Sequence, residues 1–93
     1  MSGASKLQKT YTVPNKLGLH ARPAALFVQA VQRFRCSVLV AKGDTEVNGK
    51  SLMGLMMLAA EQGSQLRVTL DGADAAQALV ELDKLFVRRF DEA

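Results

Sequence analysis

The chain has 93 residues, of which 12 are Lys or Arg and 9 are Asp or Glu, and 48% are hydrophobic. These values predict one small, soluble globular domain, and they exclude a second domain and a large enzyme with a deep, enclosed substrate chamber. The net charge of +3 is modest and scattered along the sequence, so charge alone indicates no nucleic-acid partner.

The composition indicates a cytoplasmic protein. The single cysteine, Cys36, cannot form an intramolecular disulfide, so the fold needs no oxidising compartment. Residues 1–6 are small and polar and lack the apolar core of a signal peptide, so we expect a flexible tail ahead of one domain over 7–93. The longest nearly apolar stretch, 52–60, is far too short to span a membrane, and we expect no membrane insertion.

Side-chain periodicity predicts the elements of the first third. Over residues 7–13 apolar side chains alternate with polar ones, which is typical of a half-buried strand. Turn residues at 14–18 end this strand and leave His20 in a loop. From Pro23 to Phe34 the apolar residues recur at helical spacing, so an amphipathic helix is expected there.

A hairpin and a short helix are predicted next. Residues 37–42 are rich in Val and Leu, and turn residues separate them from a short run at 45–47. Ser51 is placed to cap a helix that extends to about Ala60, and Gly63 stands where a helix C-terminal glycine is expected.

The last part of the chain predicts a strand and a long helix. Residues 66–71 alternate strictly between apolar and polar, and Asp74 and Gln77 have the spacing of a capping box. An apolar stripe at helical spacing then continues to Phe90. The order strand, helix, strand, strand, helix, strand, helix predicts an α+β domain with the helices over one face of a sheet.

His20 is the leading candidate for chemistry. It lies three positions before Pro23, where the predicted helix starts, and Pro23 suits a first helical turn, where its missing N–H would have no partner. Arg22, which precedes a proline, is expected to be extended and is the candidate cap. The free amides of such a helix end attract phosphate and disfavour a positive charge on a nearby imidazole. A neutral imidazole is a nucleophile, and Arg22 could bind a phosphoryl group placed on it.

Other interpretations of His20 remain open. It could be a surface loop residue that makes a local capping bond, with Arg22 merely solvated. A metal site has little support, because Cys36 is the only other soft ligand and the chain has no second histidine. Spacing alone does not exclude a Ser-His-Asp or Cys-His pair, but no nucleophile elbow or cysteine signature is present. We therefore expect neither a metal nor a cofactor.

The segment around Ser51 carries a second signal. Gly49-Lys50-Ser51 is not a phosphate-binding loop, because that motif needs glycine at the position of Asp44. The following helix has Leu or Met on every side, more than a short helix can bury, so part of it is expected to be an exposed docking patch. Leu55 and Leu58 are the better core candidates. We also assign Cys36 and the aromatic residues to the core.

Two motifs give the chain a family resemblance. Gly18-Leu19-His20-Ala21-Arg22-Pro23-Ala24 and Gly49-Lys50-Ser51-Leu52-Met53-Gly54 together resemble the histidine-containing phosphocarrier (HPr) family of the bacterial phosphotransferase system. The resemblance covers about residues 7–91. It implies an open-faced β-sandwich of four antiparallel strands, with three helices on one side.

The resemblance also implies roles for individual residues. Enzyme I, charged by phosphoenolpyruvate, would pass a phosphoryl group to Nδ1 of His20, which would pass it to a sugar-specific Enzyme IIA. Arg22 would stabilise the phosphohistidine, and Ser51 would be the regulatory serine, phosphorylated by an HPr kinase/phosphorylase. The expected docking surface consists of Ala21, Arg22, Ala25, Leu52, Met53 and Met56. Such a carrier is not an enzyme, and a monomer is expected.

Three rival functions are compatible with parts of the sequence. A nitrogen-branch carrier is disfavoured by the match at Gly49-Lys50-Ser51, and a purely regulatory relative by the presence of His20. A small basic nucleic-acid-binding module suits the charge and the order of elements. It would need exposed aromatics and a stripe of Arg and Lys, which the sequence does not show.

Overall fold

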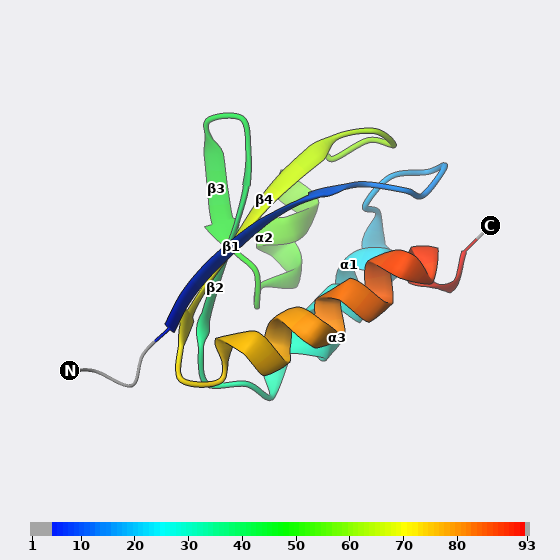
Figure 1. Ribbon diagram of the computed structural model, residues 1–93. Coiled ribbons are helices and arrows are strands. Elements are labelled where there is room, and N and C mark those ends of the chain that lie inside the picture. Colours follow the sequence, from blue (N-terminus) through cyan, green and yellow to red (C-terminus); the bar gives the residue numbers. More distant parts are fainter. Residues whose placement is uncertain (1–4, 93) are drawn as a thin grey trace.

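The computed structural model describes residues 5–92 and shows a curved sheet with helices on one side (Figure 1). The elements in chain order are β1 (Ser5–Thr12), α1 (Ala21–Gln32), β2 (Ser37–Lys42), β3 (Thr45–Asn48), α2 (Leu52–Met57), β4 (Gln65–Gly72), α3 (Ala75–Val87) and the 3-10 turn η1 (Arg89–Asp91). The predicted α+β order is confirmed. None of the helices in this part of the chain is long and apolar enough to cross a membrane.

The sheet has the strand order β1-β4-β2-β3, and every neighbouring pair is antiparallel. The alternation predicted for β4 holds, because Leu66, Val68 and Leu70 are completely buried while Arg67 points to the other face. This two-residue period gives the sheet one apolar face, and the helices cover it.

β1 begins earlier than expected. The sequence predicted a tail over residues 1–6 and a strand from Leu7, but Ser5 and Lys6 already belong to β1. They pair with Gly72 and Asp71 of β4. The start of β1 is therefore set by its pairing with the neighbouring strand and not by the alternation of its side chains. Residues 1–4 of the expected tail lie outside the described residues.

Aromatic side chains join the helices to the sheet. The ring of Tyr11 on β1 stacks on Phe86 of α3 with the centroids 4.1 Å apart. Phe86 also makes edge contacts with Phe27 of α1, at 6.4 Å, and with Phe90, at 4.8 Å. These four rings are buried, whereas Phe34 is only partly buried. The prediction that the aromatics serve the core is confirmed.

α2 ends sooner than predicted. The helix stops at Met57, and Ala59 takes a left-handed conformation with φ of 49° in place of a continued helix to Ala60. Nζ of Lys42, on β2, donates hydrogen bonds to the carbonyls of Leu58 and Ala59 at 3.1 Å, which satisfies two carbonyls at this helix end. The expected C-terminal glycine, Gly63, lies later in a turn, where its N–H bonds to the carbonyl of Val13.

The predicted capping box at the start of α3 is wrong. Asp74 occupies the N-cap position, but its side chain makes no bond within the helix. Its carboxylate instead accepts the backbone N–H groups of Arg35, at 2.8 Å, and Cys36, at 2.9 Å. The hydrogen bond from Arg35, with a smaller contribution from Cys36, lowers the pKa of Asp74. Cys36 is buried, as predicted. This burial raises the pKa of its thiol.

The C-terminal helix is also shorter than predicted. α3 stops at Val87, and Arg89, Phe90 and Asp91 have φ angles of 55°, 54° and 58°. The chain therefore turns left-handed where the apolar stripe predicted a continued helix. Phe90 is completely buried in this conformation, and its burial is the gain that offsets the unfavourable backbone.

Candidate functional site

A tight loop brings His20 to the start of α1. The N–H of Gly18 bonds to the carbonyl of Asn15, and the N–H of Leu19 bonds to the carbonyl of Ala60 at 2.8 Å. Gly18 has φ of 73°, and a Cβ there would lie 2.4 Å from the carbonyl oxygen of Ala60, so only glycine fits. The side chain of Leu19 is buried, and this anchors the backbone directly before His20.

α1 begins at Ala21 with His20 itself as the N-cap residue. The sequence predicted a start at Pro23 with Arg22 as the extended cap, and both predictions are wrong. Arg22 is helical, because the preference for extended backbone before proline yields to a helix already nucleated by the bond from the Ala24 N–H to the carbonyl of His20. Pro23 lies in the first turn, as expected.

The imidazole is available for chemistry at this helix end. His20 makes no side-chain capping bond, which removes the interpretation of a local cap. Its side chain is 36% exposed, so the ring lies at the surface. The amides of Ala21 and Arg22 belong to the first turn, where an α-helix offers them no acceptor, and they give this end a partial positive charge.

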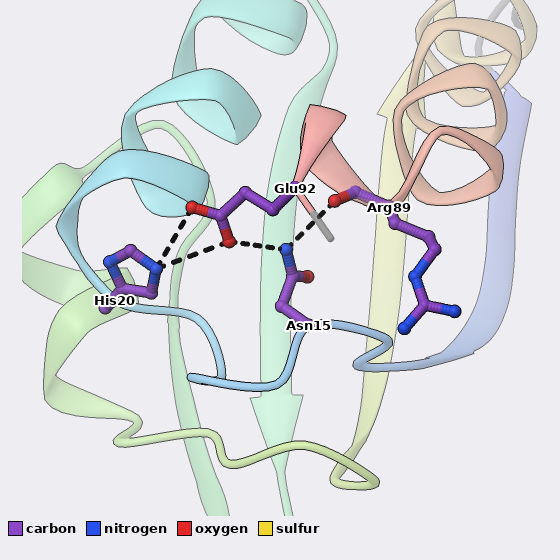
Figure 2. A network of polar contacts seen from close by, with 4 residues as sticks. All are labelled: Asn15, His20, Arg89 and Glu92. Carbon is purple, nitrogen blue, oxygen red and sulfur yellow. Dashed lines mark hydrogen bonds and ion pairs between the residues drawn. The ribbon is translucent and has the colours of Figure 1, made fainter.

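The carboxylate of Glu92 lies against the ring of His20 (Figure 2). Its Oε2 and Oε1 atoms are 3.2 and 3.3 Å from Nε2 of the imidazole. Nδ2 of Asn15 donates to the same Oε1 at 2.8 Å and to the carbonyl of Arg89 at 3.0 Å. Within residues 5–92 the other ring nitrogen of His20, Nδ1, has no hydrogen-bond partner.

Two shallow depressions flank this site. One, of about 440 Å³, reaches from His20 to Met56 on α2 and is also lined by Lys16, Leu17 and Glu61. The other, of about 370 Å³, is lined by Lys16, Leu17, Arg22, Asp91 and Glu92. Arg22 is exposed and forms no ion pair within the described part of the chain, so its guanidinium is free to meet an anion.

The expected docking residues are accessible. Leu52, Met53 and Met56 of α2 are 41%, 74% and 43% exposed, whereas Leu55 and Leu58 are buried as predicted. Ala21 is exposed and Ala25 is partly exposed on α1, which packs against α2. Met56 and His20 line the same depression, so the structure brings part of the apolar surface to the histidine.

Ser51 caps α2 as predicted. Its Oγ accepts the N–H of Gly54 at 3.0 Å, and its backbone is extended, as an N-cap residue requires. The preceding turn is held by Asn48, whose Oδ1 accepts the N–H of Lys50 at 2.8 Å. The side chain of Ser51 is partly exposed at the edge of the apolar surface of α2.

Sequence reasoning missed three residues of the site. Glu92 and Asn15 are 72 or more positions from the residues they contact across the site, so no local pattern reports them. Leu17 is 77% exposed and lines both depressions; an apolar residue inside a turn was the available signal. Among residues 5–92, no three His, Cys, Asp or Glu side chains are placed to hold a metal ion.

Comparisons with known proteins agree with this geometry. A family described as "PTS HPr component phosphorylation site" matches residues 7–88. The phosphocarrier protein HPr of Xylella fastidiosa is 46% identical over 86 residues, which are 92% of this chain and 97% of that protein. HPr of Pseudomonas putida is 51% identical over 85 residues, 87% of this chain and 91% of its own length.

Solved structures show the same similarity. The crystal structure of HPr from Thermoanaerobacter tengcongensis covers 94% of this chain and 98% of its own, with a TM-score of 0.89 and 40% identity. That of HPr from Bacillus anthracis covers 84% of this chain and 93% of its own, with a TM-score of 0.78 and 46% identity.

Proposed function

The chain belongs to the HPr family of phosphocarrier proteins of the phosphotransferase system, and we propose that His20 is the residue that carries the phosphoryl group. A member of this family is a phosphocarrier and not a catalytic enzyme. The observation that carries the proposal is the position of His20, whose exposed ring stands at the N-terminus of α1 with one nitrogen unpartnered.

The geometry favours Nδ1 as the accepting atom. Nε2 faces the carboxylate of Glu92, so the lone pair that remains for a phosphorus atom is that of Nδ1. The amides of the first turn of α1 and the guanidinium of Arg22 would then bind the phosphoryl oxygens. An exposed helix end contributes only about 0.3–1 kcal/mol to binding an anion, which suits a carrier that must release its phosphoryl group.

Phosphoryl transfer from Enzyme I tests the assignment of His20. Incubation with phosphoenolpyruvate and Enzyme I is expected to add roughly 80 Da, the mass of one phosphoryl group. The adduct should be stable in base and labile in acid, and it should be absent from His20→Ala. An adduct of the same kind on His20→Ala would refute the proposal.

Arg22 is tested by comparison with a second arginine, at the opposite end of the same helix. We expect Arg22→Ala to slow phosphorylation by about tenfold, which corresponds to the loss of one charge-assisted hydrogen bond. Arg33, the C-cap residue of α1, is 61% exposed and far from His20 along the helix, so Arg33→Ala is the matched control. Equal rates for the two variants would exclude Arg22 from phosphate binding.

We assign the docking of Enzyme I and Enzyme IIA to the surface around His20, formed by Ala21, Arg22, Ala25, Leu52, Met53 and Met56. Its exposed thioethers can adapt to two different partners. Met53→Asp is expected to weaken docking by about 1–2 kcal/mol, and Val80→Asp, at a half-exposed position of α3, is expected to have no effect. The KM for transfer from Enzyme I measures the difference; equal KM values would move the docking surface elsewhere.

We assign regulation to Ser51. A phosphate on its Oγ would place about −1.5 to −2 charges beside exposed Leu52 and Met53, where a partner must dock. Asp is itself a good N-cap residue, so Ser51→Asp is expected to keep the fold and slow transfer from Enzyme I. Ser51→Ala removes the cap without adding charge. It is therefore expected to lower the stability by about 1 kcal/mol and to leave the transfer rate unchanged. An unchanged rate for Ser51→Asp would refute the assignment.

A further inference from the structure

The contact between His20 and Glu92 involves a residue outside the motif around His20. Glu92 follows the last residue of the segment, 7–88, that matches the HPr family. Its side chain is only 18% exposed, and both carboxylate oxygens lie within 3.3 Å of Nε2 of His20. An unconstrained glutamate side chain is usually solvated, so contacts within the fold hold this one in place.

Asn15 supplies one anchor. It is completely buried, and its Nδ2 bonds both to Glu92 and to the backbone carbonyl of Arg89. Its Oδ1 is buried and has no partner within residues 5–92. The two hydrogen bonds that Nδ2 donates fix the orientation of this buried amide toward Glu92.

The left-handed turn η1 supplies the second anchor. Three successive residues other than glycine have positive φ, a conformation that costs roughly 1–2 kcal/mol at each residue. The turn is held by buried Phe90 and by a hydrogen bond of 2.9 Å from Nη2 of Arg89 to the carbonyl of Pro14. Backbone strain that the surroundings maintain is concentrated at functional sites, and the product of this turn is the placement of Glu92 (Figure 2).

We propose that Glu92 is a positioning residue for His20: its carboxylate keeps the ring proton on Nε2. This leaves Nδ1 free to accept the phosphoryl group and later to release that group to an acceptor. This inference rests on the proposed function of His20 as the phosphoryl carrier. A carboxylate that accepts the N–H of an imidazole fixes both its tautomer and its orientation, as in catalytic triads and metal sites.

The proton on Nε2 matters in both directions of the transfer. When the Nδ1 lone pair bonds to phosphorus, the bond from phosphorus to the donor breaks and its electron pair leaves with the donor. The ring then carries a positive charge, which the carboxylate of Glu92 stabilises through Nε2–H. On transfer to an acceptor, the electron pair of the Nδ1–P bond returns to Nδ1, and the ring leaves as neutral imidazole with Nε2–H unchanged. Without that proton the leaving group would be an anion.

Asp91 provides a charge-matched control. It lies in the same turn, one residue before Glu92, and its Oδ1 atom pairs with Nε of Arg88 at 3.1 Å. Its side chain is 57% exposed, and within the described part of the chain it forms no hydrogen bond or ion pair with His20. Asp91→Ala therefore removes the same charge from the same turn while leaving the carboxylate at Nε2.

The experiment compares Glu92→Ala, Asp91→Ala and the unaltered protein. Nitrogen chemical shifts of the His20 ring, measured at about pH 8 where histidine is normally neutral, report which nitrogen holds the proton. The unaltered protein and Asp91→Ala are expected to hold it on Nε2, and Glu92→Ala is expected to share it between both nitrogens. After phosphorylation by Enzyme I, the adduct on Glu92→Ala is expected to decay and to transfer about three- to tenfold more slowly, the loss of one charge-assisted hydrogen bond.

The outcomes separate this inference from the proposed function. If Glu92→Ala is phosphorylated on His20 but matches the unaltered protein in ring tautomer and in decay rate, Glu92 has no positioning role and the function of His20 stands. If Asp91→Ala shows the same changes as Glu92→Ala, general charge and not contact is responsible, and the inference again fails. If the adduct survives in His20→Ala, the proposed function itself is wrong.

Discussion

Replacing Gly18 with alanine tests how the loop holds His20. Gly18 has φ of +73°, and a Cβ at this position would meet the carbonyl oxygen of Ala60 at 2.4 Å and Cα of Glu61 at 3.0 Å. Both are backbone atoms, which cannot move aside as a flexible side chain can. That carbonyl also accepts the N–H of Leu19 at 2.8 Å, so the loop must shift and this hydrogen bond must lengthen.

The expected loss is the sum of three contributions. A left-handed conformation costs alanine roughly 1–2 kcal/mol, reduced by about 0.4–1 kcal/mol because alanine also restricts the unfolded chain. The broken hydrogen bond contributes about 1 kcal/mol, and displaced packing contributes about 1 kcal/mol more. Gly18→Ala is therefore expected to lower the free energy of unfolding by about 3 kcal/mol, which a domain with 5–15 kcal/mol survives.

Gly43→Ala is the matched control. Gly43 has φ of +58°, but nothing lies within 4 Å of a Cβ built there, so only the conformational contribution of about 1 kcal/mol applies. Urea unfolding followed by circular dichroism should separate the two midpoints by about 2 M, for a slope of about 1 kcal/mol per M. Gly18→Ala should also be phosphorylated more slowly, because the shifted loop carries His20. Equal midpoints for the two variants would refute the argument that the Ala60 carbonyl constrains the loop.

Two further predictions concern the core and the acid limit of stability. Phe90→Ala is expected to lower the free energy of unfolding, measured by thermal unfolding, by about 3–5 kcal/mol, because Phe90 is completely buried. Val87→Ala, at an 82% exposed position, should lower it by almost nothing. Similar losses for the two variants would show that η1 is not anchored by Phe90. Since folding lowers the pKa of Asp74, its carboxylate stabilises the fold above about pH 4 and loses this effect as pH falls through the folded value. Asp74→Ala should therefore be less stable than the unaltered protein at neutral pH, and the difference should shrink in acid; a constant difference would contradict the assigned hydrogen bonds.

Most of the fold was accessible from local patterns. The strict alternation from Leu66 to Asp71 predicted β4, and helical spacing predicted α1 and α3, because burial of one face imposes the period of the element. The cap at Ser51 was also predicted, since it is a contact between residues only three positions apart. Errors fell at element ends, where residues distant in the sequence decide the geometry.

The two ends of α3 show this reason most directly. Asp74 and Gln77 have the spacing of a capping box, yet the carboxylate of Asp74 bonds amides 38 and 39 positions away, which no local spacing reports. The apolar stripe predicted a helix through Phe90, but the backbone turns left-handed after Arg88 and the ring is buried in that conformation. In each case a distant partner outweighed the local preference.

The sequence by itself determined the order of strands and helices, the position of His20 just before a helix, and the apolar excess of α2, because these follow from residue type and spacing within a few positions. Only the tertiary structure decided that the C-terminal turn folds back so that Glu92 meets Nε2 of His20, 72 positions away. That contact depends on where Phe90 and Asn15 are buried, and burial is a property of the packed chain as a whole.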